Sequence, residues 1–264
     1  MNNQYPIVVN QNEVNETNNG ILMPNNSPGG LNASSYFSLL SSLSSVVIKQ
    51  NTSVVECLCP CCIPNSYCVY HPSSDLKLFE FNEESACCER CCCFQCRSFS
   101  MGVNNVPNNE NSTYVKLLGK KKMTLPCIIG CGTGKPVLSM DIETPKGGRL
   151  GRAKMNFNSC FCAICENRID LFDSNNNLRY VIKPNCYCIG CYGGCFAKCC
   201  TIEYHIYENN NIVGKLEKLS CDGLKTCCPK ADYYLINFPT EATPEDKMLL
   251  IIGAILLDYI SFIA

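Results

Sequence analysis

The apolar segment at residues 248–264 restricts what this chain can fold into more than any other feature. Asp258 is its one charged residue, and a helix built from the segment carries apolar side chains on every side. Such a helix must be enclosed by protein or by lipid. The preceding Thr243-Pro244-Glu245-Asp246 is a typical helix start, because Thr caps, Pro suits the first helical position and Asp completes a capping box. We therefore expect a C-terminal helix over residues 244–264.

Two environments suit this helix, and the sequence leaves both open. Seventeen helical residues span roughly 26 Å at about 1.5 Å each, which is shorter than a typical hydrocarbon core of about 30 Å. An unpaired carboxylate at Asp258 would also be costly in lipid. Length and charge therefore favour a helix buried inside the protein over a membrane span. The residues that mark this membrane or barrel-core helix are Met248, Ile252, Gly253, Asp258 and Phe262.

The middle of the chain has the alternating pattern of β-strands. Apolar and polar residues alternate over 138–143, 178–183 and 202–207, as expected of strands with one buried face. Asn-rich clusters at 174–177 and 209–211 predict turns at the ends of such runs. The domain is therefore mainly β, built of antiparallel hairpins in a sandwich or a barrel.

The hairpins recur along the chain in a similar order. A Cys-x3-Cys pair precedes the hairpin that begins near residue 138, and a second such pair precedes the hairpin that begins near residue 202. Self-similarity of this kind indicates repeated structural units. We expect two related halves, residues 66–159 and 160–240.

The N-terminal part predicts a tail followed by a helix. Residues 1–33 are rich in Asn, Pro and Gly and have too few apolar side chains to order themselves, so we expect a disordered tail before a domain at 34–264. Apolar residues then recur at helical spacing, which predicts a helix over 36–49 that lies on the domain. These residues are Tyr36, Leu39, Leu40, Leu43 and Val47.

The 25 cysteines raise the questions of whether the protein is secreted and of what its thiols do. Residues 1–19 have no basic residue and no apolar run, so they do not resemble a signal peptide. We therefore expect reduced thiols that serve as metal ligands, lipid-attachment sites or small core residues. The net charge of -1 gives no basic field, and nucleic acid is not an expected partner.

Two cysteine groups have the spacing of a metal site. Both follow the pattern Cys-x-Cys-x2-Cys, and a tetrahedral thiolate zinc site needs four such ligands that converge. Core thiols and lipid attachment remain the alternatives. The candidate zinc ligands are Cys160, Cys162, Cys165, Cys186, Cys188 and Cys191.

The sequence shows no arrangement of catalytic residues. The chain has two histidines, His71 and His205, and neither lies beside a nucleophile that it could activate. We therefore expect a protein that is not an enzyme.

Several segments together resemble the phospholipid scramblase family. The most specific is Asp-Tyr-Tyr-Leu-Ile-Asn-Phe-Pro at 232–239, followed by Asp246-Lys247-Met248 and the apolar run with its internal Asp258. The resemblance covers about residues 36–264. It implies a tubby-like twelve-stranded antiparallel β-barrel around the C-terminal helix. It also implies calcium-stimulated, ATP-independent movement of phospholipids between the leaflets of the plasma membrane.

The resemblance also implies sites for calcium and for palmitate. Asp232, Asn237 and Glu241 match the family's calcium segment, but Lys230 stands where the family has an acidic residue, and a lysine repels the cation. Thioester-linked palmitate is implied for a cysteine cluster, because two acyl chains, or one chain and a basic patch, anchor a protein stably. The candidate cysteines are Cys127 and Cys131, followed by Cys91, Cys92 and Cys93.

These inferences predict a membrane-anchored scramblase at the cytoplasmic face of the plasma membrane. Its expected partners are membrane phospholipids, and the N-terminal tail is a candidate site for protein partners. The main alternative is a membrane-tethered phosphoinositide-binding or adaptor module without transport activity. A third hypothesis is a cysteine-rich metal-binding regulator.

Overall fold

The computed structural model describes ten segments of the chain. They are residues 39–51, 63–74, 76–87, 100–105, 120–121, 139–143, 148–157, 167–185, 202–219 and 233–261. The N-terminal tail predicted at 1–33 lies outside these residues.

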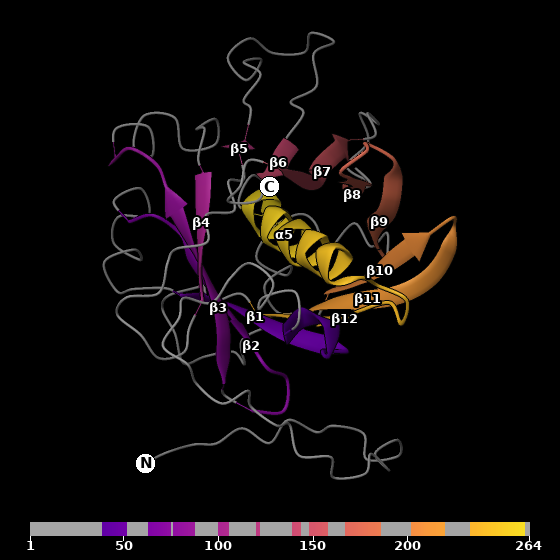
Figure 1. Cartoon of the computed structure of the whole chain (residues 1–264), viewed down its shortest axis with the longest axis horizontal. Coiled ribbons are helices and arrows are strands. Elements are labelled where there is room, and N and C mark those ends of the chain that lie inside the picture. Colours follow the sequence, from indigo (N-terminus) through magenta and orange to yellow (C-terminus); the bar gives the residue numbers. More distant parts are fainter. Residues whose placement is uncertain are drawn as a thin grey trace, which may run out of the picture.

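The described segments form one antiparallel sheet and one long helix, α5, which spans Pro244–Ser261 (Figure 1). Strands that follow one another in the chain are neighbours in the sheet, except β4 and β5, and the sheet is continuous because β1 also pairs with β12. The strands are β1 (Ser45–Asn51), β2 (Ser66–Tyr70), β3 (Lys77–Glu84), β4 (Ser100–Asn105), β5 (Lys120–Lys121), β6 (Ser139–Glu143), β7 (Arg149–Phe157), β8 (Asn167–Asp173), β9 (Leu178–Pro184), β10 (Ile202–Glu208), β11 (Asn211–Leu219) and β12 (Tyr233–Asn237).

The sheet curls around α5, with β4 and β5 as its two ends (Figure 1). The prediction of a mainly β, antiparallel domain with twelve strands is confirmed. The predicted barrel is only partly confirmed, because no ladder of hydrogen bonds joins β4 to β5 in the part of the chain that is described. The two related halves remain a prediction.

Helix α5 fills the inside of the curled sheet. Its side chains from Met248 to Asp258 are buried, in one cluster with inward-facing residues of the strands such as Ile182 and Ile236. The helix begins at Pro244, as the sequence predicts. Of the two environments left open, the structure therefore shows burial inside the protein. Within the described segments, no helix combines the length and the hydropathy that crossing a bilayer requires.

Two glycines allow the helix to lie close to the strands. A Cβ atom at Gly253 of α5 would stand 3.0 Å from Cδ1 of Ile182 and 3.2 Å from Cδ2 of Leu171. A Cβ atom at Gly151 of β7 would stand 2.7 Å from a methyl carbon of Leu249 and 2.4 Å from the backbone oxygen of Phe172. Side chains at these two positions would push the helix away from β7, β8 and β9.

The helix predicted over 36–49 is wrong for most of its length. Of its described residues, 39–49, only 39–41 are helical, and Ser45–Asn51 form strand β1. In β1 the residues Val46 and Ile48 are fully buried while their neighbours are partly exposed, which is the period of a strand. The β-branched side chains favour this conformation, and pairing with both β2 and β12 supplies it with partners.

The strand prediction over 178–183 holds except at its first residue. Tyr180 and Ile182 face the core as expected, but the side chain of Leu178 is 49% exposed. The ladder between β8 and β9 changes register at Leu171 and Phe172, so Leu178 falls outside the alternation of the rest of β9.

Candidate functional site

Asp258 ties the second half of α5 to the sheet. Its side chain is fully buried, and each of its carboxyl oxygens accepts a hydrogen bond from a tyrosine hydroxyl. The Tyr67 hydroxyl of β2 lies 2.6 Å from Oδ2, and the Tyr234 hydroxyl of β12 lies 3.0 Å from Oδ1. These contacts satisfy a carboxyl group that would be costly to bury without partners.

The first turn of α5 is fixed by the capping box that the sequence predicts. The backbone N–H of Asp246 donates to Oγ1 of Thr243 at 3.2 Å, and the N–H of Thr243 donates to Oδ2 of Asp246 at 3.1 Å. From strand β9, the Tyr180 hydroxyl lies 3.4 Å from Oδ2 of Asp246, and Nε of Arg179 lies 3.5 Å from Oδ1. The start of the helix is therefore held to the sheet as well as capped.

Lys247 joins α5 to the segment before β1. Its ammonium group donates to the backbone carbonyls of Leu40, Ser41 and Leu43 at 2.9, 3.0 and 2.8 Å. Burial lowers the pKa of Lys247 below its ordinary value, whereas the three carbonyl oxygens favour the charged form. The buried cation thus binds carbonyl groups at the end of a helical turn.

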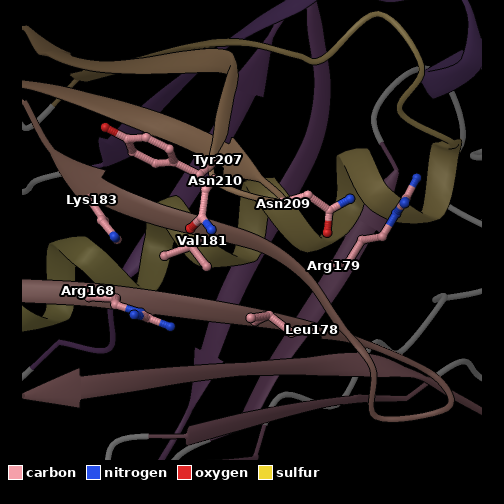
Figure 2. A pocket seen from close by; sticks show the side chains of 8 residues that line it. All are labelled: Arg168, Leu178, Arg179, Val181, Lys183, Tyr207, Asn209 and Asn210. Atoms are coloured by element: carbon pink, nitrogen blue, oxygen red, sulfur yellow. The ribbon is translucent and has the colours of Figure 1, made fainter.

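A pocket of about 230 Å³ opens on the outer face of the sheet (Figure 2). Val181 lies in the middle of the view, with Lys183 and Arg168 on one side and Arg179 on the other. The eight lining residues are Arg168, Leu178, Arg179, Val181, Lys183, Tyr207, Asn209 and Asn210.

The register of three strands brings these residues together. Val181 of β9 pairs with Asp170 of β8 and with Tyr207 of β10, while Lys183 pairs with His205. Side chains alternate across a sheet, so Val181 and Lys183 share the outer face and Tyr180 and Ile182 point to the core. The turn after β10 adds Asn209 and Asn210 to the rim.

This turn suits asparagine. Asn209 and Asn210 have φ angles of 50° and 67°, in the left-handed region that Asn tolerates better than most residues. Two such residues in a row join β10 to β11 as a tight hairpin. The rim of the pocket is therefore a short connection with polar side chains.

Carboxylates position the guanidinium groups of the pocket. Oδ1 of Asp170 lies 2.5 Å from Nε of Arg168, and Oε1 of Glu208 lies 2.5 Å from Nη1 of Arg179. Burial acts to lower the pKa of Arg179, but Tyr180, Asp246 and Glu208 outweigh it and raise the pKa, so this side chain stays charged. Nζ of Lys183 lies 5.2 Å from the centre of the Tyr207 ring, within range of a cation–π contact.

The structure places only part of the sites predicted from the sequence. Met248, Ile252, Gly253 and Asp258 are buried in α5. Asn237 ends β12, and Glu241 is exposed in the turn that follows. The other predicted residues lie outside the described segments: Asp232, the lipid-attachment candidates Cys91, Cys92, Cys93, Cys127 and Cys131, the zinc candidates Cys160, Cys162, Cys165, Cys186, Cys188 and Cys191, and Phe262.

The described residues give little support for a metal site. Asn237 and Glu241 offer two oxygen-bearing side chains, whereas calcium takes six to eight oxygen ligands. Lys215 of β11 pairs with Asn237, and a cation there disfavours a second one. Among these residues there is also no group of three His, Cys, Asp or Glu side chains that could hold a metal ion. Cys68 and Cys87 are free thiols.

Comparison with known proteins finds sequence similarity to one family. The profile of the Scramblase family matches residues 23–264. Phospholipid scramblase 1 of Homo sapiens is 24% identical over 243 residues, which are 90% of this chain and 67% of the relative. Phospholipid scramblase 2 of Bos taurus is 22% identical over 244 residues, which are 91% of this chain and 74% of the relative. No solved structure matches the chain.

Proposed function

Because this chain belongs to the Scramblase family, we propose that it is a phospholipid scramblase. It moves phospholipids in both directions between the leaflets of the plasma membrane, with stimulation by calcium and without ATP. The observation that carries the proposal is the extent of the family match, which includes the strands and all of α5. A protein of this kind is a lipid transporter and makes or breaks no covalent bond.

The position of α5 bears on how such a protein is anchored. In the conformation described, the apolar residues 248–257 of α5 are buried, so they do not contact lipid. Anchoring at the cytoplasmic face of the membrane is therefore assigned to thioacylated cysteines, with Cys127 and Cys131 as first candidates and Cys91, Cys92 and Cys93 as second. One acyl chain holds a protein weakly, and two hold it stably.

Calcium stimulation rests on the resemblance of residues 232–241 to the family's calcium segment. Asn237 and Glu241 do not make a calcium site by themselves, because the ion takes several more oxygen ligands than these two side chains offer. Zinc at the two Cys-x-Cys-x2-Cys groups likewise stays a prediction. Both can be tested on the purified reduced protein by measuring bound metal.

Reconstitution tests the proposed transport directly. The full chain is inserted into liposomes that carry phospholipid probes whose leaflet can be read, and exchange is followed with calcium and with a calcium chelator. We expect exchange above the rate of protein-free liposomes, and faster exchange with calcium. Exchange at the protein-free rate in both conditions would contradict the scramblase assignment.

A second candidate function is a membrane-tethered module that binds lipid headgroups without transporting lipid. The observation that favours it is the pocket of Figure 2, which has three cationic residues on the outer face of the sheet. The same liposomes separate the two functions, since a headgroup-binding module binds the vesicles but leaves the exchange rate unchanged.

A further inference from the structure

We propose that the pocket on β8, β9 and β10 binds the phosphate-bearing headgroup of an anionic phospholipid, and that this face of the sheet docks on the membrane. The inference rests on the proposed function in one respect, namely that the chain works at phospholipid membranes. It adds the surface that meets the lipid and the class of headgroup that the surface selects.

The lining of the pocket carries positive charge. Of the eight lining residues, Arg168, Arg179 and Lys183 are cationic, and none is acidic. Guanidinium and ammonium groups are the side chains that bind phosphate oxygens, and arginine does so through paired N–H donors. The lining residues thus offer an anion several positive donors, while Asp170 and Glu208, which pair with the two arginines, are not part of the lining.

The ion pairs hold the two arginines in place but involve only some of their N–H groups. An arginine side chain has five N–H donors. The ion pairs described for Arg168 involve its Nε, and those for Arg179 involve Nε and Nη1. Other donors of each guanidinium therefore remain for a ligand. A group fixed in this way loses less freedom when it binds, which favours affinity.

Exposed apolar side chains lie beside these cations. Among the described residues, the exposed large apolar side chains are Leu76, Leu178 and Ile212. Leu178 lines the pocket, and Ile212, which is not a lining residue, pairs across the ladder with the lining residue Tyr207. Their side chains are 49% and 58% exposed.

Apolar side chains next to cations are the composition of a surface that meets anionic lipid, because the side chains enter the headgroup layer while the cations contact phosphates. A pocket for a free phosphate compound needs the cations but not the apolar neighbours. The combination therefore favours a membrane-bound headgroup over a soluble phosphate ligand.

Lys183 offers the cleanest test because Lys49 provides a matched control. Both are partly buried lysines on the outer face of a strand, and both lie over tyrosine rings, Lys49 at 4.7 Å from Tyr70 and at 5.7 Å from Tyr233. Lys49 lies on β1, whose neighbours in the sheet are β2 and β12 rather than the strands of the pocket. Substitutions at the two positions change net charge equally.

The experiment measures binding of the full chain to vesicles of phosphatidylcholine alone, and of phosphatidylcholine with phosphatidylserine or with phosphatidylinositol bisphosphate. We expect binding to require the anionic lipid. Removing one cation near a lipid surface weakens binding about five-fold, so Lys183→Gln should lose about five-fold and Lys183→Glu roughly 25-fold. Lys49→Gln and Lys49→Glu should bind as the unmodified chain does. Circular dichroism checks that all variants are folded.

A second measurement distinguishes a membrane lipid from a soluble phosphate compound as the ligand of the pocket. Leu178→Ser should weaken binding to anionic vesicles but leave binding of free inositol trisphosphate unchanged. Equal loss in the Lys49 and Lys183 variants, or binding to neutral vesicles alone, would overturn the proposal. So would binding of the soluble headgroup without binding of the vesicles.

The outcomes also distinguish this inference from the proposed function. A chain that binds anionic vesicles through Lys183 but does not exchange lipid between leaflets contradicts only the scramblase assignment. A chain that exchanges lipid at an unchanged rate and binds vesicles equally well in the Lys183→Glu variant contradicts only the headgroup site.

Discussion

Replacement of Asp258 by leucine tests whether the structure places α5 correctly. Inside the sheet, Asp258→Leu removes the acceptor of the Tyr67 and Tyr234 hydroxyls, which lie 2.6 and 3.0 Å from its two oxygens. A buried donor left without a partner costs about 1–3 kcal/mol. The two hydroxyls together therefore predict a loss of about 2–6 kcal/mol in the free energy of unfolding.

A membrane-spanning helix would respond in the opposite direction. A carboxylate at the centre of a bilayer costs roughly 2.5–3.5 kcal/mol, so leucine at position 258 would favour insertion. The two environments thus differ in the sign of the effect as well as in its size. This makes Asp258→Leu more informative than a substitution that only weakens a contact.

Guanidinium unfolding of the purified full chain, followed by far-ultraviolet circular dichroism, measures the difference. For a domain of this size we also expect a fall in Tm of roughly 2–4 °C for each kcal/mol lost. Adding Tyr67→Phe and Tyr234→Phe to the Leu variant should recover part of the loss, because no buried hydroxyl then lacks a partner. Unchanged or increased stability in Asp258→Leu would refute the buried position of the helix.

Three further predictions concern stability. Lys247→Met removes the ammonium contacts with three carbonyls and should lower the free energy of unfolding by about 1.5–3 kcal/mol in denaturant titrations. An unchanged value would mean that burial alone holds the segment before β1. Gly151→Ala places a Cβ atom 2.4 Å from a backbone oxygen and should lower the free energy of unfolding by about 1–3 kcal/mol. In the control Gly102→Ala, the Cβ atom meets only the end of the flexible Glu84 side chain at 3.3 Å, so the loss should be smaller. Differential scanning calorimetry compares the two variants. Burial and then Asp246 raise the pKa of Tyr180 above its ordinary value of 10.0. The folded state therefore favours the neutral tyrosine, and this contribution to stability is present below about pH 10 and is lost as the pH rises above about 10. Stability should therefore fall less steeply above about pH 10 in Tyr180→Phe than in the unmodified chain, and equal slopes would contradict the assignment.

Local sequence patterns predicted the parts of the fold that depend on local interactions. The start of α5 at Pro244 follows from capping groups within four residues, and the faces of Tyr180 and Ile182 follow from alternation within one strand. The sequence indicates that an unpaired Asp258 would be costly in lipid, but its partner Tyr67 lies 191 residues away in the chain. Nothing near either residue in the sequence identifies the other.

Strand β1 and the pocket could not be predicted for the same reason. Val46 and Ile48 adopt a strand because β2 and β12 flank them, and a contact with β12 is a contact with the far end of the chain. The pocket depends on the ladders that place Lys183 beside His205 and Val181 beside Tyr207. In the sequence, its cations look like ordinary polar positions of separate strands, and only the register shows that they form one surface.

The order of elements along the chain has a consequence for biosynthesis. Helix α5 follows all twelve strands, so the ribosome makes the entire sheet before it makes the helix that fills it. Strand β1 must also wait for β12 before its second edge is paired. Until residues 244–261 have emerged, the apolar inner face of the sheet has no cover, and exposed surface of this kind is what chaperones bind. The nascent chain therefore completes its folding only after the last strand and the helix have left the exit tunnel.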